Sequence, residues 1–267
     1  MRQYIIDAFV GDGLRGNPAA VCLPDRALTD AEMLAVAQEN NLSETSYLRE
    51  NRGFWEIRWF TPVAEIDFCG HATLAAAFAL FRYHGAAGTV RFRGRIGELT
   101  AQANDPFDGR VRLCFPAYDD TEKLCISEEF REITGCEVTG AYASRDLMLV
   151  LPDAESVQRC QPDLQRMSLL PYSCIAVTAR ADSGEFDVIS RVFAPRLGIA
   201  EDPVTGSTHC MIAPYWSGVL GKPRLRCLQA STRGGVLETL YSPQGHTVEI
   251  DAAASVFAES EIYIPSV

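Results

Sequence analysis

The sequence lacks the features that mark several large classes of proteins. None of its nine cysteines belongs to a CxxC pair, and no cluster of cysteine and histidine has zinc-finger spacing. The longest helix-like apolar run, residues 72–81, is far shorter than the roughly 20 residues that cross a bilayer. We therefore expect no disulfide framework, no zinc finger and no membrane span. The scattered cysteines are expected to be reduced and mostly buried thiols.

Basic residues are also in short supply. Lysine and arginine total 24 against 35 aspartate and glutamate residues, so the formal net charge is −11. Nucleic acids and anionic membranes both require basic patches, and this charge argues against both as partners. A small anionic ligand is still allowed, because a local group of backbone N–H donors can outweigh a distant net charge. The apolar run near the N-terminus is too short for a signal peptide, so we expect a cytoplasmic protein.

Two stretches of the chain share one plan. Residues 58–81 read RWFTPVAEIDFCGHATLAAAFALF, and residues 201–216 read EDPVTGSTHCMIAPYW. In each, a glutamate stands five residues before a glycine, and a small polar turn then opens an apolar helix. The first N–H groups of a helix lack partners and the helix dipole adds positive potential, so such loops attract anions. The repeat predicts two halves with a carboxylate-binding site in the cleft between them.

The length and composition of the chain accommodate such a duplication. With 267 residues and 47% apolar content, the chain can form one large domain or two of ordinary size. The polar, acidic connection over 116–123 is the expected boundary, which divides the chain into residues 1–117 and residues 118–267. The β-rich tail over 255–264 is expected to add a strand to either half.

The remaining pattern alternates many short strands with a few helices. Residues 11–18 contain a GxGxxG match, but Asn17-Pro18 prevents a helix from starting where a dinucleotide site needs one, so we expect a hairpin-type connection. Thr29 and Glu32 form a capping-box pattern. Helices are expected over 30–39, 71–83, 127–134 and 157–164, and again from residue 206. Strands are expected over 3–10, 19–23, 54–60, 88–92, 98–103, 110–115, 142–151, 173–179, 186–193, 236–241 and 247–250.

Four polar residues near the two loops are candidates for chemistry. His71 opens an apolar helix, where the positive helix end favours a neutral imidazole that can both donate and accept a hydrogen bond. Glu44 precedes an apolar strand, and a carboxylate in an apolar cleft is suited to act as a general base. Asp202 and Ser207 flank the start of the second helix. Ordinary alternatives remain open: a histidine bonded to a backbone carbonyl, a surface-turn glutamate and simple helix caps.

Cys69 has two interpretations. A pair of cysteines facing each other can act as base and acid in racemisation at a Cα atom. The second loop reads Val204-Thr205-Gly206-Ser207 and has no cysteine at the matching position, while Cys210 falls inside the helix. We therefore interpret Cys69 as a packed thiol.

Five motifs occur together and in a fixed order along the chain. They are GNPAAV (16–21), SET (43–45), RWFTP (58–62), Glu65 with FCGHAT (68–73), and EDPVTGS (201–207). In combination they resemble the PhzF-like phenazine-biosynthesis family, which shares its fold with diaminopimelate epimerase. The resemblance covers most of the chain, and it is the combination rather than any single motif that is specific.

The resemblance implies an α+β fold of two similar halves, each a mixed β-sheet wrapped around a central helix, with the active site in the cleft between them. It implies an isomerase that needs no cofactor and no metal, and that is commonly a homodimer. The best-known members convert trans-2,3-dihydro-3-hydroxyanthranilate to its keto isomer by moving a proton from C3 of the ring.

The resemblance also implies roles for individual residues. The position matching Glu44 takes and returns the proton. The positions matching His71, Asp202 and Ser207 line the site and hydrogen-bond the substrate. Backbone N–H groups in the two loops would hold a carboxylate; the substrate-binding residues are Gly70, Ala72, Gly206 and Thr208.

The chain departs from the family pattern at two places. Thr208 stands where alanine is more familiar, and Thr45-Ser46 follows Glu44 where an Ala-Phe pair is common. The second departure alters the pocket wall and leaves the substrate open. Three functions therefore stay in play: an isomerase using Glu44, an amino-acid racemase or epimerase using two bases, and a small-molecule-binding module of the same fold without turnover.

Overall fold

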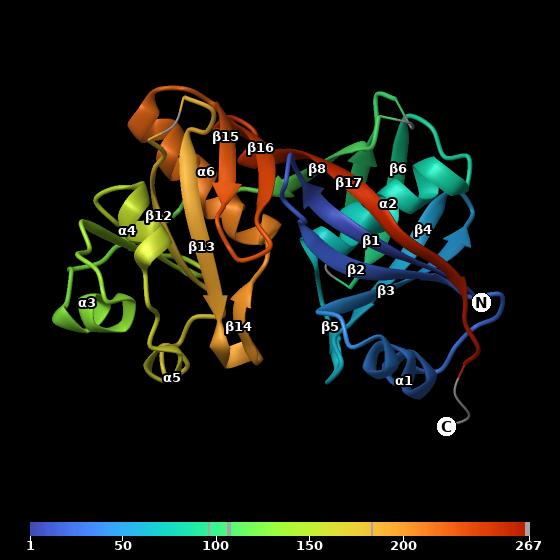
Figure 1. Cartoon of the computed structure of the whole chain (residues 1–267). Coiled ribbons are helices and arrows are strands. Elements are labelled where there is room, and N and C mark those ends of the chain that lie inside the picture. Colours follow the sequence, from blue (N-terminus) through green and yellow to red (C-terminus); the bar gives the residue numbers. More distant parts are fainter. Residues whose placement is uncertain (96, 106–107, 183, 265–267) are drawn as a thin grey trace. The chain divides into compact units, whose positions relative to one another are not determined.

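The computed structural model describes residues 1–95, 97–105, 108–182 and 184–264. The chain groups into two compact units. The first consists of residues 1–114 and 251–267, and the second of residues 115–250. Figure 1 shows the elements of each unit with their labels. Across the described ranges, no helix is both long enough and apolar enough to cross a membrane.

The strands of the first unit form a closed circuit of pairings, an eight-strand barrel. Strand β2 pairs with β1 and runs parallel to β3; β4 is antiparallel to β3 and parallel to β6; β7 joins β6 to β8, and β17 joins β8 back to β1. Their bounds are β1 Arg2–Val10, β2 Asn17–Leu23, β3 Glu44–Asn51, β4 Phe54–Phe60, β6 Thr89–Gly94, β7 Gly97–Gln102, β8 Arg110–Pro116 and β17 Thr247–Glu261.

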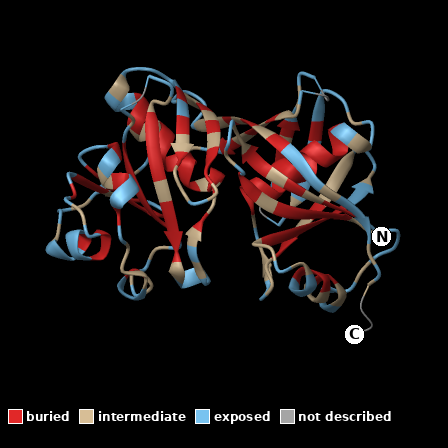
Figure 2. Ribbon diagram, viewed as in Figure 1, coloured by how far each residue is buried: buried red, intermediate tan, exposed pale blue. Residues whose placement is uncertain are grey.

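Helix α2, Gly70–Tyr83, is the buried element of this unit. Twelve of its fourteen residues are buried, and the helix contacts β1, β2, β3 and β7 (Figures 1 and 2). A helix that is apolar all round belongs in an interior, and its five alanines allow strands to approach closely. Helix α1, Asp30–Asn40, instead packs on β3 and β4, with the capping box of Thr29 and Glu32 that the sequence predicted.

The second unit has more, shorter elements. Its core gathers apolar side chains from β10 to β13 and from α3, α4 and α5. Its strands are β9 Glu122–Lys123, β10 Gly140–Ala143, β11 Leu147–Val150, β12 Ile175–Arg180, β13 Val188–Ala194, β14 Ile199–Asp202, β15 Arg224–Gln229 and β16 Gly235–Ser242. Its helices are α3 Glu128–Thr134, α4 Ala154–Arg159, α5 Leu164–Met167, the 3-10 turn η1 Pro195–Leu197, and α6 Gly206–Leu220.

The order of strand pairings in the first unit recurs in the second. Strands β2, β3, β4, β6 and β7 pair parallel, antiparallel, parallel and antiparallel in turn, and β11, β12, β13, β15 and β16 repeat that order. Helix α2 follows the short strand β5 (Glu65–Ile66), which pairs with β4; α6 follows β14, which pairs with β13. The pairing order repeats, whereas the equal wrapping of a sheet around a helix in both halves stays a prediction.

Two elements expected from the sequence are wrong. Residues 142–151 form two antiparallel strands, β10 and β11, because Ser144 N–H donates to Asp146 O and turns the chain between them. Residues 157–164 do not form one helix: α4 ends at Arg159 and α5 begins at Leu164, because Pro162 cannot continue a helix begun at Ala154. The sequence analysis also missed the six-residue strand β15 and the short strands β5, β9 and β14, of which β5 and β14 are counterparts.

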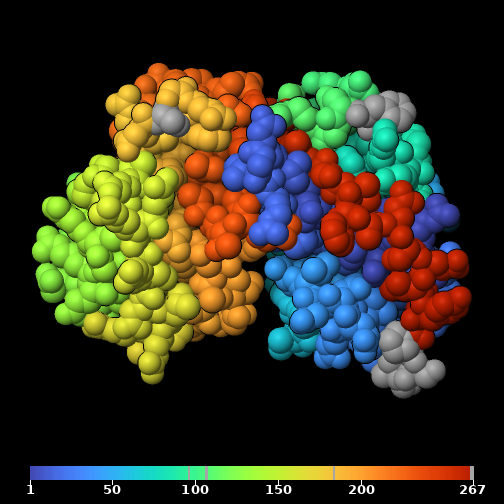
Figure 3. Space-filling view, in the orientation of Figure 1, coloured from blue at the N-terminus to red at the C-terminus, as the bar shows by residue number. Residues whose placement is uncertain are grey.

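The C-terminal segment belongs to the first unit. Residues 253–261 of β17 pair antiparallel with β1, and Figure 3 shows this red segment lying against the blue N-terminal segment. Ala254 N–H also donates to Gly109 O at 2.8 Å. The boundary expected at 117/118 stays a prediction. All nine cysteines are free thiols and six of them are buried, as expected from their spacing.

Candidate active site

An ion pair between β4 and β5, just before the Cys69-Gly70-His71 turn, holds this turn in place. Arg58 on β4 donates from Nε and Nη2 to both oxygens of Glu65 on β5, each at 2.7 Å. Its guanidinium also lies 5.1 Å from the centre of the Phe60 ring. Such a bidentate pair constrains orientation as well as distance. It therefore fixes the strand that leads into the turn and the start of α2.

Four buried side chains meet at the start of α2. His71 Nε2 lies 3.1 Å from Glu44 Oε2, while His71 Nδ1 lies 3.3 Å from Asn17 Nδ2 and 3.4 Å from Cys69 Sγ. Glu44 reaches the group because β3 runs parallel to β2 with Glu44 opposite Ala19, two residues after Asn17. Segments 17–19, 44 and 69–71 thus build one polar cluster in an apolar surrounding.

The charge of His71 is set by these neighbours. Burial by itself lowers the pKa of the ring, but negative charge at Cys69 and Glu44 outweighs burial and raises the pKa well above its ordinary value. Burial also raises the pKa of the Cys69 thiol, and a nearby charge at Glu44 adds to this effect. The neutral ring expected from the helix start is therefore wrong in direction, because the sequence does not show that Glu44 lies beside it.

The two helices that start at the predicted loops lack side-chain caps. The N-cap residues Cys69 of α2 and Thr205 of α6 make no capping hydrogen bond, and neither first turn contains an acidic residue. Helices α1, α3, α4 and α5 are all capped by a side chain at their N-cap, namely Thr29, Ser127, Asp153 and Asp163. The starts of α2 and α6 thus have the positive potential and uncapped N–H groups that suit an anion.

In the second unit, Asp202 is part of a buried network at the start of α6. Thr205 Oγ1 donates to Asp202 Oδ2 at 2.5 Å, and Gln229 on β15 receives Thr205 N–H at 2.8 Å and donates to Asp202 O at 2.8 Å. The side chain of Thr205 is therefore used to hold Asp202 rather than to cap the helix. Gln229 thus links Thr205 to Asp202, and the sequence analysis did not identify this residue.

Ser207 and Thr208 contact the turn between β10 and β11. Arg145 Nη2 donates to Ser207 Oγ at 2.9 Å, and Thr208 Oγ1 donates to Asp146 Oδ2 at 3.0 Å. Asp146 is buried and also receives Arg145 Nη2 at 2.6 Å. The sequence analysis interpreted residues 142–151 as one strand. The polar turn within this segment supplies hydrogen-bond partners to Ser207 and Thr208.

The Arg–Glu pair of the first unit also recurs. Arg191 on β13 donates from Nε and Nη2 to Glu201 on β14 at 2.7 and 3.1 Å, and its guanidinium lies 5.1 Å from the centre of the Phe193 ring. In sequence, R-x-F at 191–193 matches R-x-F at 58–60. Each pair joins the strand before the loop to the strand that leads into the helix.

Three side chains of the cluster could hold a metal ion. One ligand atom from each of Glu44, Cys69 and His71 lies within 4.8 Å of the others. Carboxylate, thiolate and imidazole form a ligand set that suits Zn²⁺. The expectation of a metal-free site stays a prediction, and it is tested below.

Comparisons with known proteins agree with this architecture. The sequence profile described as "Phenazine biosynthesis-like protein" matches residues 6–260. The chain belongs to this family. It is 38% identical over 262 residues to an uncharacterized isomerase of Pseudomonas aeruginosa, covering 98% of both chains. It also matches the crystal structure of a PhzF-family phenazine biosynthesis protein of Enterococcus faecalis, with a TM-score of 0.92, 40% identity and 98% coverage of both chains.

A more distant likeness concerns the fold alone. The structure of a probable proline racemase from Agrobacterium radiobacter K84 aligns with a TM-score of 0.65 at 11% identity, covering 99% of this chain and 93% of the other. The predicted resemblance to the phenazine-biosynthesis family is confirmed, and so is its coarser consequence, a PhzF-like fold shared with racemase-like and epimerase-like proteins.

Within this family member, the predicted site residues fall into two sets. Glu44, His71, Gly70 and Ala72 lie together in the first unit, and the second unit holds Asp202, Gly206, Ser207 and Thr208. The joint use of both sets on one substrate stays a prediction. The residues that sequence reasoning did not assign are Asn17, Arg145, Asp146 and Gln229. Of these, only Asn17 had a signal, its place in the GNPAAV motif.

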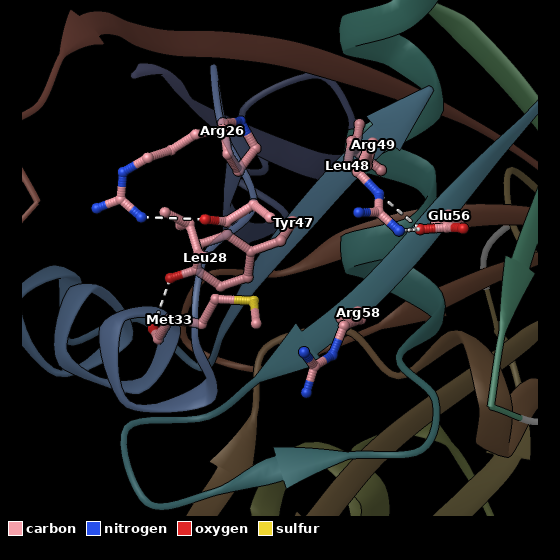
Figure 4. Close-up of a pocket in the computed structure, with 10 residues that line it drawn as sticks. Arg26, Leu28, Met33, Tyr47, Leu48, Arg49, Glu56 and Arg58 are labelled. Atoms are coloured by element: carbon pink, nitrogen blue, oxygen red, sulfur yellow. Dashed lines mark hydrogen bonds and ion pairs between the residues drawn. The ribbon is translucent and has the colours of Figure 1, made fainter. Parts of the chain in front are cut away.

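A pocket of about 150 Å³ in the first unit contains none of the predicted catalytic residues. It lies between the end of β2, α1 and strands β3 and β4, with Tyr47 donating to Met33 O at 2.6 Å (Figure 4). Its three arginines are all paired with carboxylates, Arg26 with Glu32, Arg49 with Glu56, and Arg58 with Asp30 and Glu65. These pairs leave the pocket without an unpaired charge for a ligand, and we assign it no role.

Proposed function

We propose that this PhzF-family protein is a cofactor-independent isomerase that moves a proton within a small carboxylate substrate. The observation that carries the proposal is the buried Glu44 carboxylate, 3.1 Å from His71 Nε2 at the uncapped start of α2. A carboxylate that is removed from bulk water and beside a proton-carrying ring is suited to accept a proton from carbon and to return it. The isomerase name of the bacterial relative supports this reaction class.

The proposed reaction is an intramolecular proton transfer. Glu44 removes a proton from a carbon next to a double bond or carbonyl, the electron pair shifts along the conjugated system, and Glu44 then delivers a proton to another carbon. While Glu44 holds the proton, it can exchange with solvent, which makes the reaction visible in D2O. His71 donates a hydrogen bond to the oxygen or nitrogen on which negative charge develops. The N–H groups at the start of α2 hold the substrate carboxylate. Asp202 and Ser207 are proposed as further substrate contacts, on the strength of the motif resemblance.

The test is replacement of Glu44 by glutamine. This variant keeps the shape of the side chain but cannot accept a proton, so we expect the exchange of substrate hydrogen with D2O to fall by about 10²–10⁴-fold while ligand binding persists. The assay is mass-shift detection over a panel of cyclic β-hydroxy and α-amino carboxylates. Glu50→Gln, at an exposed glutamate of the same strand, is the matched control and should retain full exchange. Full exchange by Glu44→Gln would refute the assignment.

A racemase or epimerase with two bases is the second candidate. Cys69 lies 3.4 Å from His71 Nδ1, which is a suitable place for a proton-transferring thiol. In the second unit the matching N-cap residue is Thr205, and Cys210 is buried within α6 with Sγ directed to Gly206 O. Deuterium entering the Cα of a chiral amino acid, with loss of this exchange in Cys69→Ala, would support this candidate over the Glu44 isomerase. Binding of a ligand without any exchange would support a binding module.

A further inference from the structure

The two ring nitrogens of His71 have chemically different neighbours. Asn17 Nδ2, an amide nitrogen that can only donate, lies 3.3 Å from Nδ1. Glu44 Oε2, an acceptor when ionised, lies 3.1 Å from Nε2. The Cys69 thiol, 3.4 Å from Nδ1, is a weak donor on the same side as Asn17. A donor therefore faces one nitrogen and an acceptor faces the other.

The backbone holds Asn17 in this place. Gly16 has a φ of +63°, and a Cβ atom at this position would lie 2.1 Å from Ala8 O, so only glycine allows the chain to turn this closely against β1. Asn17 then begins β2, paired with Ala8, and is fully buried. The glycine-asparagine segment that superficially matches a dinucleotide motif thus delivers an amide to the histidine.

We propose that Asn17 is a positioning residue: when the charged His71 ring gives up one of its two protons, Asn17 keeps the remaining proton on Nε2, facing Glu44. In this arrangement Nδ1 accepts from the Asn17 amide, and Nε2–H faces the Glu44 carboxylate. Glu44 Oε2 lies 3.1 Å from Nε2 and has no hydrogen-bond partner among the described residues, so it stays available as a base. The opposite tautomer would set the bare Nε2 against Glu44 Oε2. Two hydrogen-bond acceptors can lie 3.1 Å apart only if one of them carries a proton. Glu44 would then be protonated and could not act as the base.

The second buried histidine provides an internal reference. His209 Nδ1 lies 2.9 Å from Thr205 O, a carbonyl that can only accept. Its proton must therefore sit on Nδ1, which leaves Nε2 bare. The structure thus assigns opposite tautomers to His71 and His209 within the same chain. The other two histidines, His84 and His246, are exposed.

The test is nitrogen NMR of the full chain labelled with 15N only at its four histidines. Protonated and bare ring nitrogens resonate in well-separated ranges, so each tautomer is read directly, in a pH series that extends above the titration of His71. We expect the proton on Nε2 in His71 and on Nδ1 in His209. In Asn17→Asp, an acceptor replaces the donor, and His71 should carry a proton on Nδ1. In Asn17→Leu, only Glu44 still favours a proton on Nε2, so this preference should weaken without reversing.

Asn40→Ala is the matched control. Asn40 donates its amide to Gln3 and Thr45 in the same unit but does not contact His71, so the His71 signals should stay unchanged. Unchanged His209 signals in each variant show that the second unit is still folded, and circular dichroism checks the rest. A wild-type His71 with a bare Nε2, or His71 signals that are the same in both folded Asn17 variants, would overturn the proposal.

The consequence for turnover rests on the proposed role of Glu44. Asn17→Leu should lower kcat for D2O exchange about tenfold with KM little changed, because the ring presents its proton toward Glu44 less often. A loss confined to KM would contradict a positioning role. The two proposals fail separately: full exchange in Glu44→Gln would refute the isomerase assignment and leave the tautomer result standing, because the NMR measurement needs no substrate.

Discussion

Single residues in this protein take their chemistry from neighbours that are distant in sequence. His71 and His209 occupy nearby positions in the first turn of matching helices, α2 and α6, yet their pKa values shift in opposite directions. His71 has the Glu44 carboxylate beside it, which favours its charged form. His209 has only a backbone carbonyl, so burial dominates and lowers its pKa to about 4. The position of each histidine at the start of its helix therefore does not determine the direction of its pKa shift.

His209 should make stability depend on pH between about 6.5 and 4. In the unfolded chain it takes up a proton below its ordinary pKa of about 6.5, whereas in the folded chain it stays neutral down to about 4. The unfolded state therefore binds more protons as the pH falls, and the fold should lose about 3 kcal/mol from this group. The measurement is urea unfolding of wild type and His209→Gln across this range.

The difference in unfolding free energy between these two proteins isolates His209 from the carboxylates, which titrate in both. His71 does not make the free energy of unfolding depend on pH between about 6.5 and 4, because its pKa in the folded protein is raised. Its stabilisation is fully present below about 6.5 and is lost only as the pH rises through the raised value. Parallel pH profiles for wild type and His209→Gln would show that His209 is charged in the folded protein.

Removal of metal should leave activity intact. Glu44 and His71 together supply the proposed proton transfer, so D2O exchange after treatment with EDTA and desalting should equal that of untreated protein. The control is the same protein to which Zn²⁺ is returned. Loss of exchange with EDTA and its recovery with Zn²⁺ would mean that the Glu44, Cys69 and His71 group holds a metal.

At the level of elements, ion pairs fasten the strands that lead into the two uncapped helices. Arg191 joins β13 to β14 through Glu201 and also donates to Cys160 O at the end of α4 at 2.8 Å. Both partners are mostly buried, with side chains 14% and 21% exposed. Three elements of the second unit therefore depend on one guanidinium.

Replacement of Arg191 by methionine should be strongly destabilising. It leaves Glu201 mostly buried without its partner, which typically costs about 3–5 kcal/mol. Arg224→Met is the matched control: Arg224 is 58% exposed, lies 4.0 Å from Glu238, and should change stability by less than about 1 kcal/mol. Urea unfolding midpoints measure both. Equal midpoints for the two variants would show that the Arg191–Glu201 pair contributes little.

At the level of the whole molecule, the C-terminal strand completes a unit that begins at the N-terminus. Residues 253–261 of β17 pair with β1, and β17 also pairs with β8, so this strand closes the barrel. Without it, two edges of the barrel would expose unpaired backbone groups. Assembly into a homodimer stays a prediction, which light scattering of the purified protein can check.

A chain that ends at Ile250 should therefore fail to fold its first unit. Trp55 and Trp59 lie in that unit and Trp216 in the other, so a Trp216→Phe background reports on the first unit alone. Trp59 is buried, and we expect its fluorescence in the shortened chain to shift to the red and to lose its cooperative urea transition. The full-length Trp216→Phe protein is the control. An unchanged transition would show that the barrel does not need β17.

Local sequence patterns predicted most of the secondary structure correctly. The capping box at Thr29, the strand over 54–60 and the helix after Gly70 follow from residue spacing and capping chemistry. The errors arose where spacing was ambiguous: the turn at 144–146 lies in a run of strand-forming residues, and Pro162 divides what appeared to be one helix. The recurring Glu-to-Gly spacing predicted two matching loops, and these start the two uncapped helices.

The sequence alone thus determined the strand and helix pattern, the repeated loops, the family, and Glu44 and His71 as candidates, because each of these depends on residues close together in the chain or on a motif. It could not show that Glu44 lies 3.1 Å from His71, that the ring favours its charged form, that Asn17 faces Nδ1, or that β17 closes the first barrel. Those facts depend on strand register and on burial, which bring together segments from distant parts of the chain and set their electrostatics.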